Sequence, residues 1–151
     1  MESGTLRKKI LFLTGTRADF GKLKSLIAAI EDEKHYESYI FATGMHTLAR
    51  YGATVDEIRE YGFKNIYTYI NQGSTAETHM DVVLASTIQG LGNYTREYNP
   101  DLIMVHGDRV EALAGAAVGS LNNVLVGHVE GGEVSGSIDE LIRHAVTKLA
   151  H

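Results

Sequence analysis

Short apolar runs alternate with amphipathic stretches along the whole chain. Runs rich in Ile, Leu, Val and aromatic residues predict buried strands at 9–13, 36–43, 65–70, 102–105 and 124–129. Between most of these runs, apolar residues recur every three or four positions, which is the spacing of one helix face. The predicted helical stripes are Leu23, Leu26, Ile27 and Ile30; Met80, Val83, Leu84, Thr87 and Leu91; Val110, Leu113, Ala114, Ala117 and Leu121; and Ile138, Leu141, Ile142, Ala145 and Leu149. This alternation predicts an α/β fold with a doubly wound, Rossmann-like parallel sheet.

Residues that start and stop helices refine this outline. Ser74-Thr-Ala-Glu77 has the pattern of a capping box, and Pro100 marks the end of the helix that follows it. Residues 44–62 are expected to form a loop and a short helix. Residues 1–7 are polar and basic and are predicted to be a flexible lead-in, so the lobe covers 8–151. The last helical stripe runs to the end of the chain without a glycine cap, which favours a partial lobe.

Ionisable residues gather where two of the predicted strands end. His106, Asp108 and Arg109 follow the fourth strand, while His128 and Glu130 close the fifth. In an open parallel sheet the carboxyl ends of the strands meet at one crevice, and ligands bind there. If these two strands are neighbours, Glu130 is expected beside Asp108, and two neighbouring carboxylates shift each other's pKa, so that one can serve as an acid and the other as a base. The pattern therefore predicts proton-transfer chemistry at this crevice.

The same acids have a purely structural interpretation, which the sequence leaves open. Asp108 and Glu111 could form a capping box, and Ser137 with Glu140 could do the same for the last helix. Asp139 would then only complement the dipole at that helix start. His106 could be a satisfied imidazole at a strand end.

The loop Thr14-Gly-Thr-Arg-Ala-Asp19 joins the first strand to the first helix. A helix start offers free N–H groups and a positive dipole end to an anion, and Arg17 adds a guanidinium that can hold phosphate. The alternative is a plain turn in which Asp19 caps the helix. The loop lacks the GxGxxG pattern, so nothing in it indicates a nicotinamide or flavin cofactor.

Composition narrows the class of protein. The 151 residues carry a net charge of −5, which argues against a nucleic-acid or acidic-membrane partner. The chain has no cysteine, which excludes disulfides, cysteine–zinc sites and thiol nucleophiles. No apolar run approaches the roughly 20 residues of a membrane span. A cytoplasmic protein without a metal or organic cofactor is expected.

Four segments together resemble the UDP-N-acetylglucosamine 2-epimerases. They are TGTRADFGKL, TGMH at 43–46, VHGDR at 105–109 and HVEGGEVSGSIDELIRHAVTKLAH at the end of the chain. The Ala18-Asp19 pair and the GGEVSG loop are similar to the hydrolysing branch, whereas the other branch carries GTRPE and HVEAGLR. The resemblance implies the N-terminal lobe of a two-lobe GT-B enzyme, with the second lobe absent from this chain.

The resemblance also implies a reaction and a set of residues. Elimination of UDP from UDP-N-acetylglucosamine, followed by addition of water, would give N-acetylmannosamine for sialic-acid-type sugars. The implied catalytic residues are Asp108, Glu130, Asp139, His106 and His128. The implied substrate-binding residues are Arg17, Asp19, His46, Arg109 and Arg143, although position alone would make Arg143 a surface charge and His46 a solvated loop residue. A homo-oligomer, dimer or tetramer, is expected. The alternatives are a non-catalytic nucleotide-sugar-binding fragment and a GT-B glycosyltransferase lobe.

Overall fold

The computed structural model describes residues 4–52, 54–73 and 78–151. The strands are β1 (Lys8–Thr14), β2 (Tyr36–Ala42), β3 (Ile66–Thr68), β4 (Leu102–His106) and β5 (Leu125–Val129), and the α-helices are α1 (Arg17–Glu31), α2 (Val55–Glu60), α3 (Met80–Tyr98), α4 (Val110–Leu121) and α5 (Ile138–Leu149). Short 3₁₀ turns at Gly44–Thr47 and Ala49–Tyr51 precede α2. The predicted strands and helices are therefore confirmed, with shifted ends. The capping box predicted at Ser74–Glu77 lies outside the described residues.

The strands form one parallel sheet in the order β3-β2-β1-β4-β5. The chain moves outward from β1 to β3, crosses back through α3, and then moves outward from β4 on the other side. The strand order therefore reverses between β1 and β4, and the crevice of a doubly wound sheet opens at the carboxyl ends of these two strands. The predicted fold class is confirmed.

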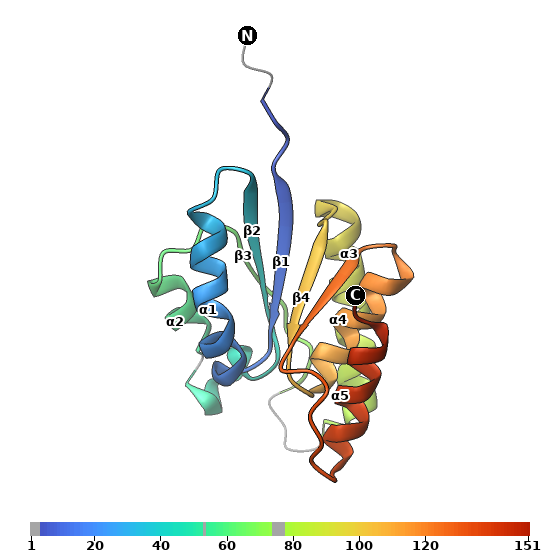
Figure 1. Ribbon diagram of the computed structural model, residues 1–151. Helices are drawn as coiled ribbons and strands as arrows, with labels where there is room; N and C mark the ends of the chain where they lie inside the picture. Colours follow the sequence, from blue (N-terminus) through green and yellow to red (C-terminus); the bar gives the residue numbers. More distant parts are fainter. Residues whose placement is uncertain (1–3, 53, 74–77) are drawn as a thin grey trace.

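Helices cover both faces of the sheet (Figure 1). α1 and α2 pack on one face around Phe12, Leu23 and Ile40, whereas α3, α4 and α5 lie on the other face around Leu11, Ile103 and Val126. Parallel strands buried on both faces read as continuous apolar runs, which is why periodicity identified them so clearly. No helix in residues 4–52, 54–73 and 78–151 has the length and apolar content to span a bilayer.

Glycines let α4 lie unusually close to the sheet. A Cβ on Gly115 would come within 2.6 Å of Val105 Cγ1, and one on Gly119 would overlap Val126 Cγ2. Glycine costs a helix roughly 1 kcal/mol relative to alanine, so its use here is explained by this close approach. The approach matters for the site, because α4 starts directly after Asp108 and Arg109.

Candidate active site

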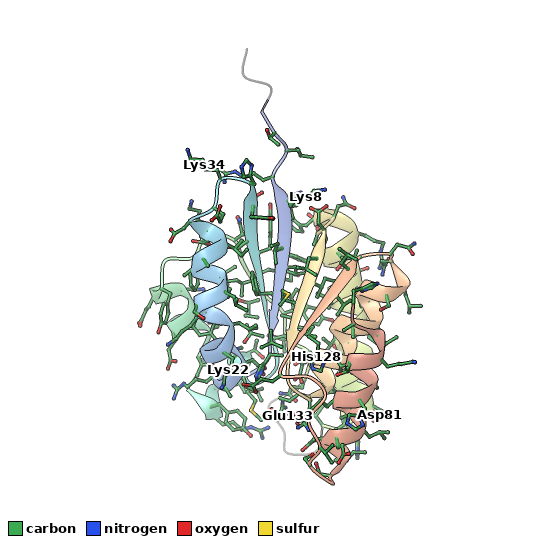
Figure 2. All side chains as sticks on the ribbon, in the orientation of Figure 1. Lys8, Lys22, Lys34, Asp81, His128 and Glu133 are labelled. Atoms are coloured by element: carbon green, nitrogen blue, oxygen red, sulfur yellow. The ribbon has the colours of Figure 1, made fainter. Side chains whose placement is uncertain are left out.

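Strand ends and the first turn of α1 bring a chain of ionisable side chains together. His106, the last residue of β4, contacts Asp19 of α1 through Nδ1 at 2.8 Å and Glu130 through Nε2 at 3.0 Å. The other oxygen of Glu130 is 2.9 Å from Lys22 Nζ. Figure 2 shows Lys22 at the carboxyl end of the sheet, near His128 and Glu133, while Lys8 and Lys34 lie at the opposite end. The partners of Glu130 are thus His106 and Lys22, and the sequence analysis missed Lys22. Asp108, the expected neighbour of Glu130, pairs with Arg143 instead.

The electrostatics of this cluster follow from its geometry. The hydrogen bond to Asp19 raises the pKa of His106 above its ordinary value of 6.5, against the opposing effect of partial burial, and Glu130 adds to the increase. Lys22 lowers the pKa of the Glu130 carboxyl, and His106 lowers it further. Glu130 in turn raises the pKa of Lys22. Opposite charges each favour the ionised form of their neighbour.

Asp19 does not cap α1, so that structural interpretation is wrong. The cap is Thr16, whose hydroxyl accepts a hydrogen bond from the backbone N–H of Asp19 at 3.1 Å. The Asp19 carboxylate turns inward instead, is 7% exposed, and accepts the Gly15 N–H at 3.0 Å. Both of its oxygens therefore have partners within the protein, and direct contact between Asp19 and a substrate is not part of this arrangement.

Asp108 pairs with Arg143 of α5 at the carboxyl end of the sheet. One guanidinium nitrogen of Arg143 binds Asp108 Oδ2, and another donates to the Glu133 carbonyl at 3.0 Å. The N-cap of α4 is Arg109, without a side-chain cap, so the capping box of Asp108 and Glu111 is not formed. The expectation that Arg143 is a surface charge is also wrong, because its side chain is buried. Arg143 ties the glycine-rich loop to the Asp108 carboxylate.

Asp139 lies in the first turn of α5 and is exposed. Within the described part of the chain, no hydrogen bond joins it to Asp108 or Glu130. Ser137 occupies the N-cap position but its hydroxyl makes no cap bond. Glu140 instead accepts the backbone N–H groups of Gly136 and Ser135, and these bonds lower the pKa of its carboxyl. The predicted capping box at this helix is therefore only half formed, and a catalytic role for Asp139 stays a prediction.

Two of the predicted site histidines have both ring nitrogens occupied by the protein. His128 contacts the Thr147 hydroxyl at 2.9 Å and the Gly107 carbonyl at 2.8 Å, so it links β5 to α5 and to the loop after β4. His46 contacts Thr14 Oγ1 at 2.8 Å and Thr54 Oγ1 at 2.6 Å. Burial lowers the pKa of His46 to about 4. The expectation of a solvated His46 is wrong, because the 3₁₀ turn that carries it folds under the carboxyl end of β1. A substrate contact by its buried ring is not part of this arrangement.

Two of the predicted substrate-binding arginines, Arg17 and Arg109, already have protein partners. Arg17 is exposed at the start of α1, and its guanidinium pairs with Glu57 of α2. Arg109 Nε lies 3.4 Å from Glu111 Oε2. Arg17 is the first residue of α1, where the free N–H groups of the helix start favour an anion.

Glu111 is a second residue whose importance the sequence analysis missed. Its side chain is 2% exposed and lies under the loops at the ends of β1 and β2. A Cβ on Gly15 would be 3.3 Å from the Glu111 carboxyl carbon, and Asn71 donates to Glu111 Oε1 at 3.4 Å. A glutamate in the first helical turn has the pattern of a capping or dipole residue, so no local signal indicated that Glu111 is buried under these loops.

The chain is a doubly wound, Rossmann-like lobe whose ionisable groups lie at the topological switch point, where the strand order reverses between β1 and β4. This chain matches one lobe of solved structures that have a two-lobe, GT-B type fold. The match covers about 40% of the length of those structures. The sequence model described as UDP-N-acetylglucosamine 2-epimerase matches residues 28–151. The chain belongs to this family.

Individual relatives agree with this assignment. The chain is 48% identical over 144 residues to a UDP-N-acetylglucosamine 2-epimerase of Neisseria meningitidis serogroup B, covering 95% of this chain and 38% of that protein. It is 34% identical to a UDP-N,N'-diacetylbacillosamine 2-epimerase (hydrolyzing) of Legionella pneumophila, with the same coverage. The S. aureus MnaA–UDP co-structure matches with a TM-score of 0.80 and 28% identity, over 95% of this chain and 37% of that one. The chain thus spans under two-fifths of the length of these relatives.

Proposed function

We propose that the protein containing this chain is a hydrolysing UDP-N-acetylglucosamine 2-epimerase, and that this chain supplies the acid–base half of its active site. The observation that carries the proposal is the meeting of His106, Glu130 and Lys22 at the switch point, beside the pair of Asp108 and Arg143. Family membership supports the sugar nucleotide as substrate. The GGEVSG loop and the relative named as hydrolyzing support the subtype.

The proposed reaction has two stages. In the first, a base removes the proton at C2 of the sugar, a C1=C2 double bond forms, and the C1–O bond breaks with its electrons leaving on UDP. In the second, water adds its hydroxyl to C1 while a proton returns to C2 on the opposite face, which gives N-acetylmannosamine. Base, acid and water-positioning groups are needed for these stages, and we assign them jointly to Asp108, Glu130 and Asp139.

Stabilisation of the leaving diphosphate is the other requirement of this chemistry. The start of α1 and Arg17 are suited to it, because developing negative charge is best held by N–H groups and cations fixed in advance. Arg17 would have to exchange its pairing with Glu57 for the diphosphate. This exchange costs little, since exposed ion pairs contribute at most about 1 kcal/mol.

Product analysis by NMR in deuterated water tests the proposal on the full-length protein. We expect UDP and N-acetylmannosamine that carries deuterium at C2, because the C2 proton is lost to a base and replaced from solvent. N-acetylglucosamine as the sugar product would indicate simple hydrolysis, and unlabelled C2 would exclude elimination. A requirement for an acceptor sugar would indicate a glycosyltransferase, and UDP-sugar binding without turnover a binding protein. Diacetylbacillosamine nucleotides, run in parallel, identify the preferred sugar.

A further inference from the structure

The most unusual hydrogen-bonded group in this lobe is an imidazole held between two carboxylates. His106 is 10% exposed and contacts Asp19 at 2.8 Å and Glu130 at 3.0 Å. An ionised carboxylate can only accept hydrogen bonds, and a neutral imidazole can donate only one. With both acids ionised and the ring neutral, one of the two contacts therefore lacks a donor. Both contacts are hydrogen bonds only when the trio carries one additional proton. The doubly protonated ring is the form that satisfies both partners symmetrically.

The Asp19 end of this trio is closed to ligands. Its second oxygen accepts the Gly15 N–H at 3.0 Å, so the carboxylate is anchored to the loop between β1 and α1. The side chain is 10% exposed, and its oxygens already face His106 and Gly15. Asp19 therefore has no open oxygen for a ligand, and its link to the acid–base groups of the crevice is the ring of His106.

The Glu130 end of the trio is open and aimed by its backbone. Glu130 has φ of 58°, in the left-handed region that non-glycine residues rarely adopt, and it is not an Asn or Asp that tolerates this region more easily. Such a conformation costs on the order of 1 kcal/mol or more and persists where the surrounding structure holds it. The strained turn directs the carboxylate toward His106 and Lys22 while leaving it exposed to the crevice.

We propose that Asp19 is a positioning residue that acts through His106: it binds Nδ1 of the ring, and the ring holds the Glu130 carboxylate ionised and oriented for proton transfer. The catalytic part of this inference rests on the proposed function. The groups that bear on His106 directly are Asp19 and Glu130; Lys22 pairs with Glu130, and the charge of Glu133 acts on Lys22. Replacing the Asp19 carboxylate by a neutral amide weakens its hydrogen bond to the ring, which is the largest influence that raises the pKa of His106, and removes the attraction of its charge. The ring then becomes neutral at lower pH, and Glu130 keeps only Lys22 as a cationic partner.

Nitrogen-15 NMR of this chain tests the trio without any assay of turnover. We expect His106 to carry protons on both nitrogens near neutral pH and to titrate above 6.5, its ordinary value. In Asp19→Asn the midpoint should fall. The matched control is Asp56→Asn on α2, an exposed carboxylate that pairs with Arg59 and should leave His106 unchanged. A wild-type ring that titrates at or below 6.5 would overturn the proposal, and this measurement needs no variant to fold.

The pH dependence of the full-length protein tests the catalytic consequence. In Asp19→Asn we expect KM to stay within about twofold of wild type while the acid limb of kcat/KM moves to higher pH, because the Glu130 carboxyl loses the support of a charged His106. An equal loss at every pH would reduce Asp19 to a structural residue, and a raised KM with an unmoved limb would make it a ligand contact; either result overturns the proposal. Absence of UDP release from the wild type would instead remove the proposed function and leave the NMR test valid.

Discussion

The His46 ring provides the sharpest test of how this lobe is held together. The ring is 0% exposed and bridges Thr14 at the end of β1 to Thr54 at the start of α2. Burial lowers its pKa to about 4 in the folded chain, compared with 6.5 for an ordinary histidine. Protonation would leave a buried cation and remove the acceptor nitrogen from one of the two hydrogen bonds. The folded state therefore excludes the proton that the unfolded state takes up.

The sign and size of the effect follow from linkage. Because the folded pKa is the lower one, the unfolded chain binds more protons between about pH 6.5 and 4, and stability falls as pH falls through that window. At about 1.4 kcal/mol for each tenfold difference, the full effect is about 3 kcal/mol. Between pH 7.5 and pH 5 the loss from this one ring is about 2 kcal/mol. For a chain of this length that lowers Tm by roughly 6 °C.

Comparison with His46→Gln isolates this contribution from the other titrating groups. The variant loses about 1 kcal/mol at pH 7.5, because glutamine reproduces one of the two hydrogen bonds. Urea unfolding of both chains from pH 7.5 to 5 should show the wild type losing about 2 kcal/mol more than the variant. His106, whose raised pKa favours the folded state at low pH, acts equally in both chains. If the free energies of unfolding of the two chains fell equally as pH is lowered, the buried, neutral state of His46 would be refuted.

Three further predictions address catalysis, packing and the chain by itself. In the full-length protein, Asp108→Asn and Glu130→Gln should each lower kcat by about 10²–10⁴-fold with the fold intact by circular dichroism, and normal turnover in both would assign these acids to structure. Gly119→Ala should lower the free energy of unfolding in urea by about 1–3 kcal/mol, because its Cβ would overlap Val126 Cγ2. The control Gly21→Ala on α1, whose Cβ would meet nothing within 4 Å, should raise it by up to about 1 kcal/mol. Equal effects of the two substitutions would contradict the close approach of α4 to the sheet. This chain alone should bind UDP weakly by calorimetry and release no UDP at an appreciable rate, since enclosure of the substrate supplies much of an enzyme's acceleration; turnover comparable to the full-length protein would show that this crevice is sufficient.

The strands and helices could be predicted from the sequence because hydrophobic periodicity is a local property. The central strands are buried on both faces, so they read as apolar runs, and each long helix shows an apolar stripe. Alternation of the two implied the parallel sheet, and the strand-end positions of His106, Asp108 and Glu130 implied that ionisable groups gather at one crevice. The motifs supplied the family, which the matches over residues 28–151 confirm.

Hydrogen-bond partners were decided only by the tertiary structure. Strand order and register bring Asp19 to His106 across 87 positions of sequence and Asp108 to Arg143 across 35. Capping patterns at Asp108 and Asp19 were misleading, because a carboxylate near a helix start can turn either to a backbone N–H or to a distant cation. His46 was expected to be solvated and Glu111 to cap a helix, since nothing in their local sequence reveals that neighbouring loops cover them. Local sequence determines which segments become strands and helices, whereas the ionisation and aim of each site residue depend on groups that only the folded sheet brings within hydrogen-bonding distance.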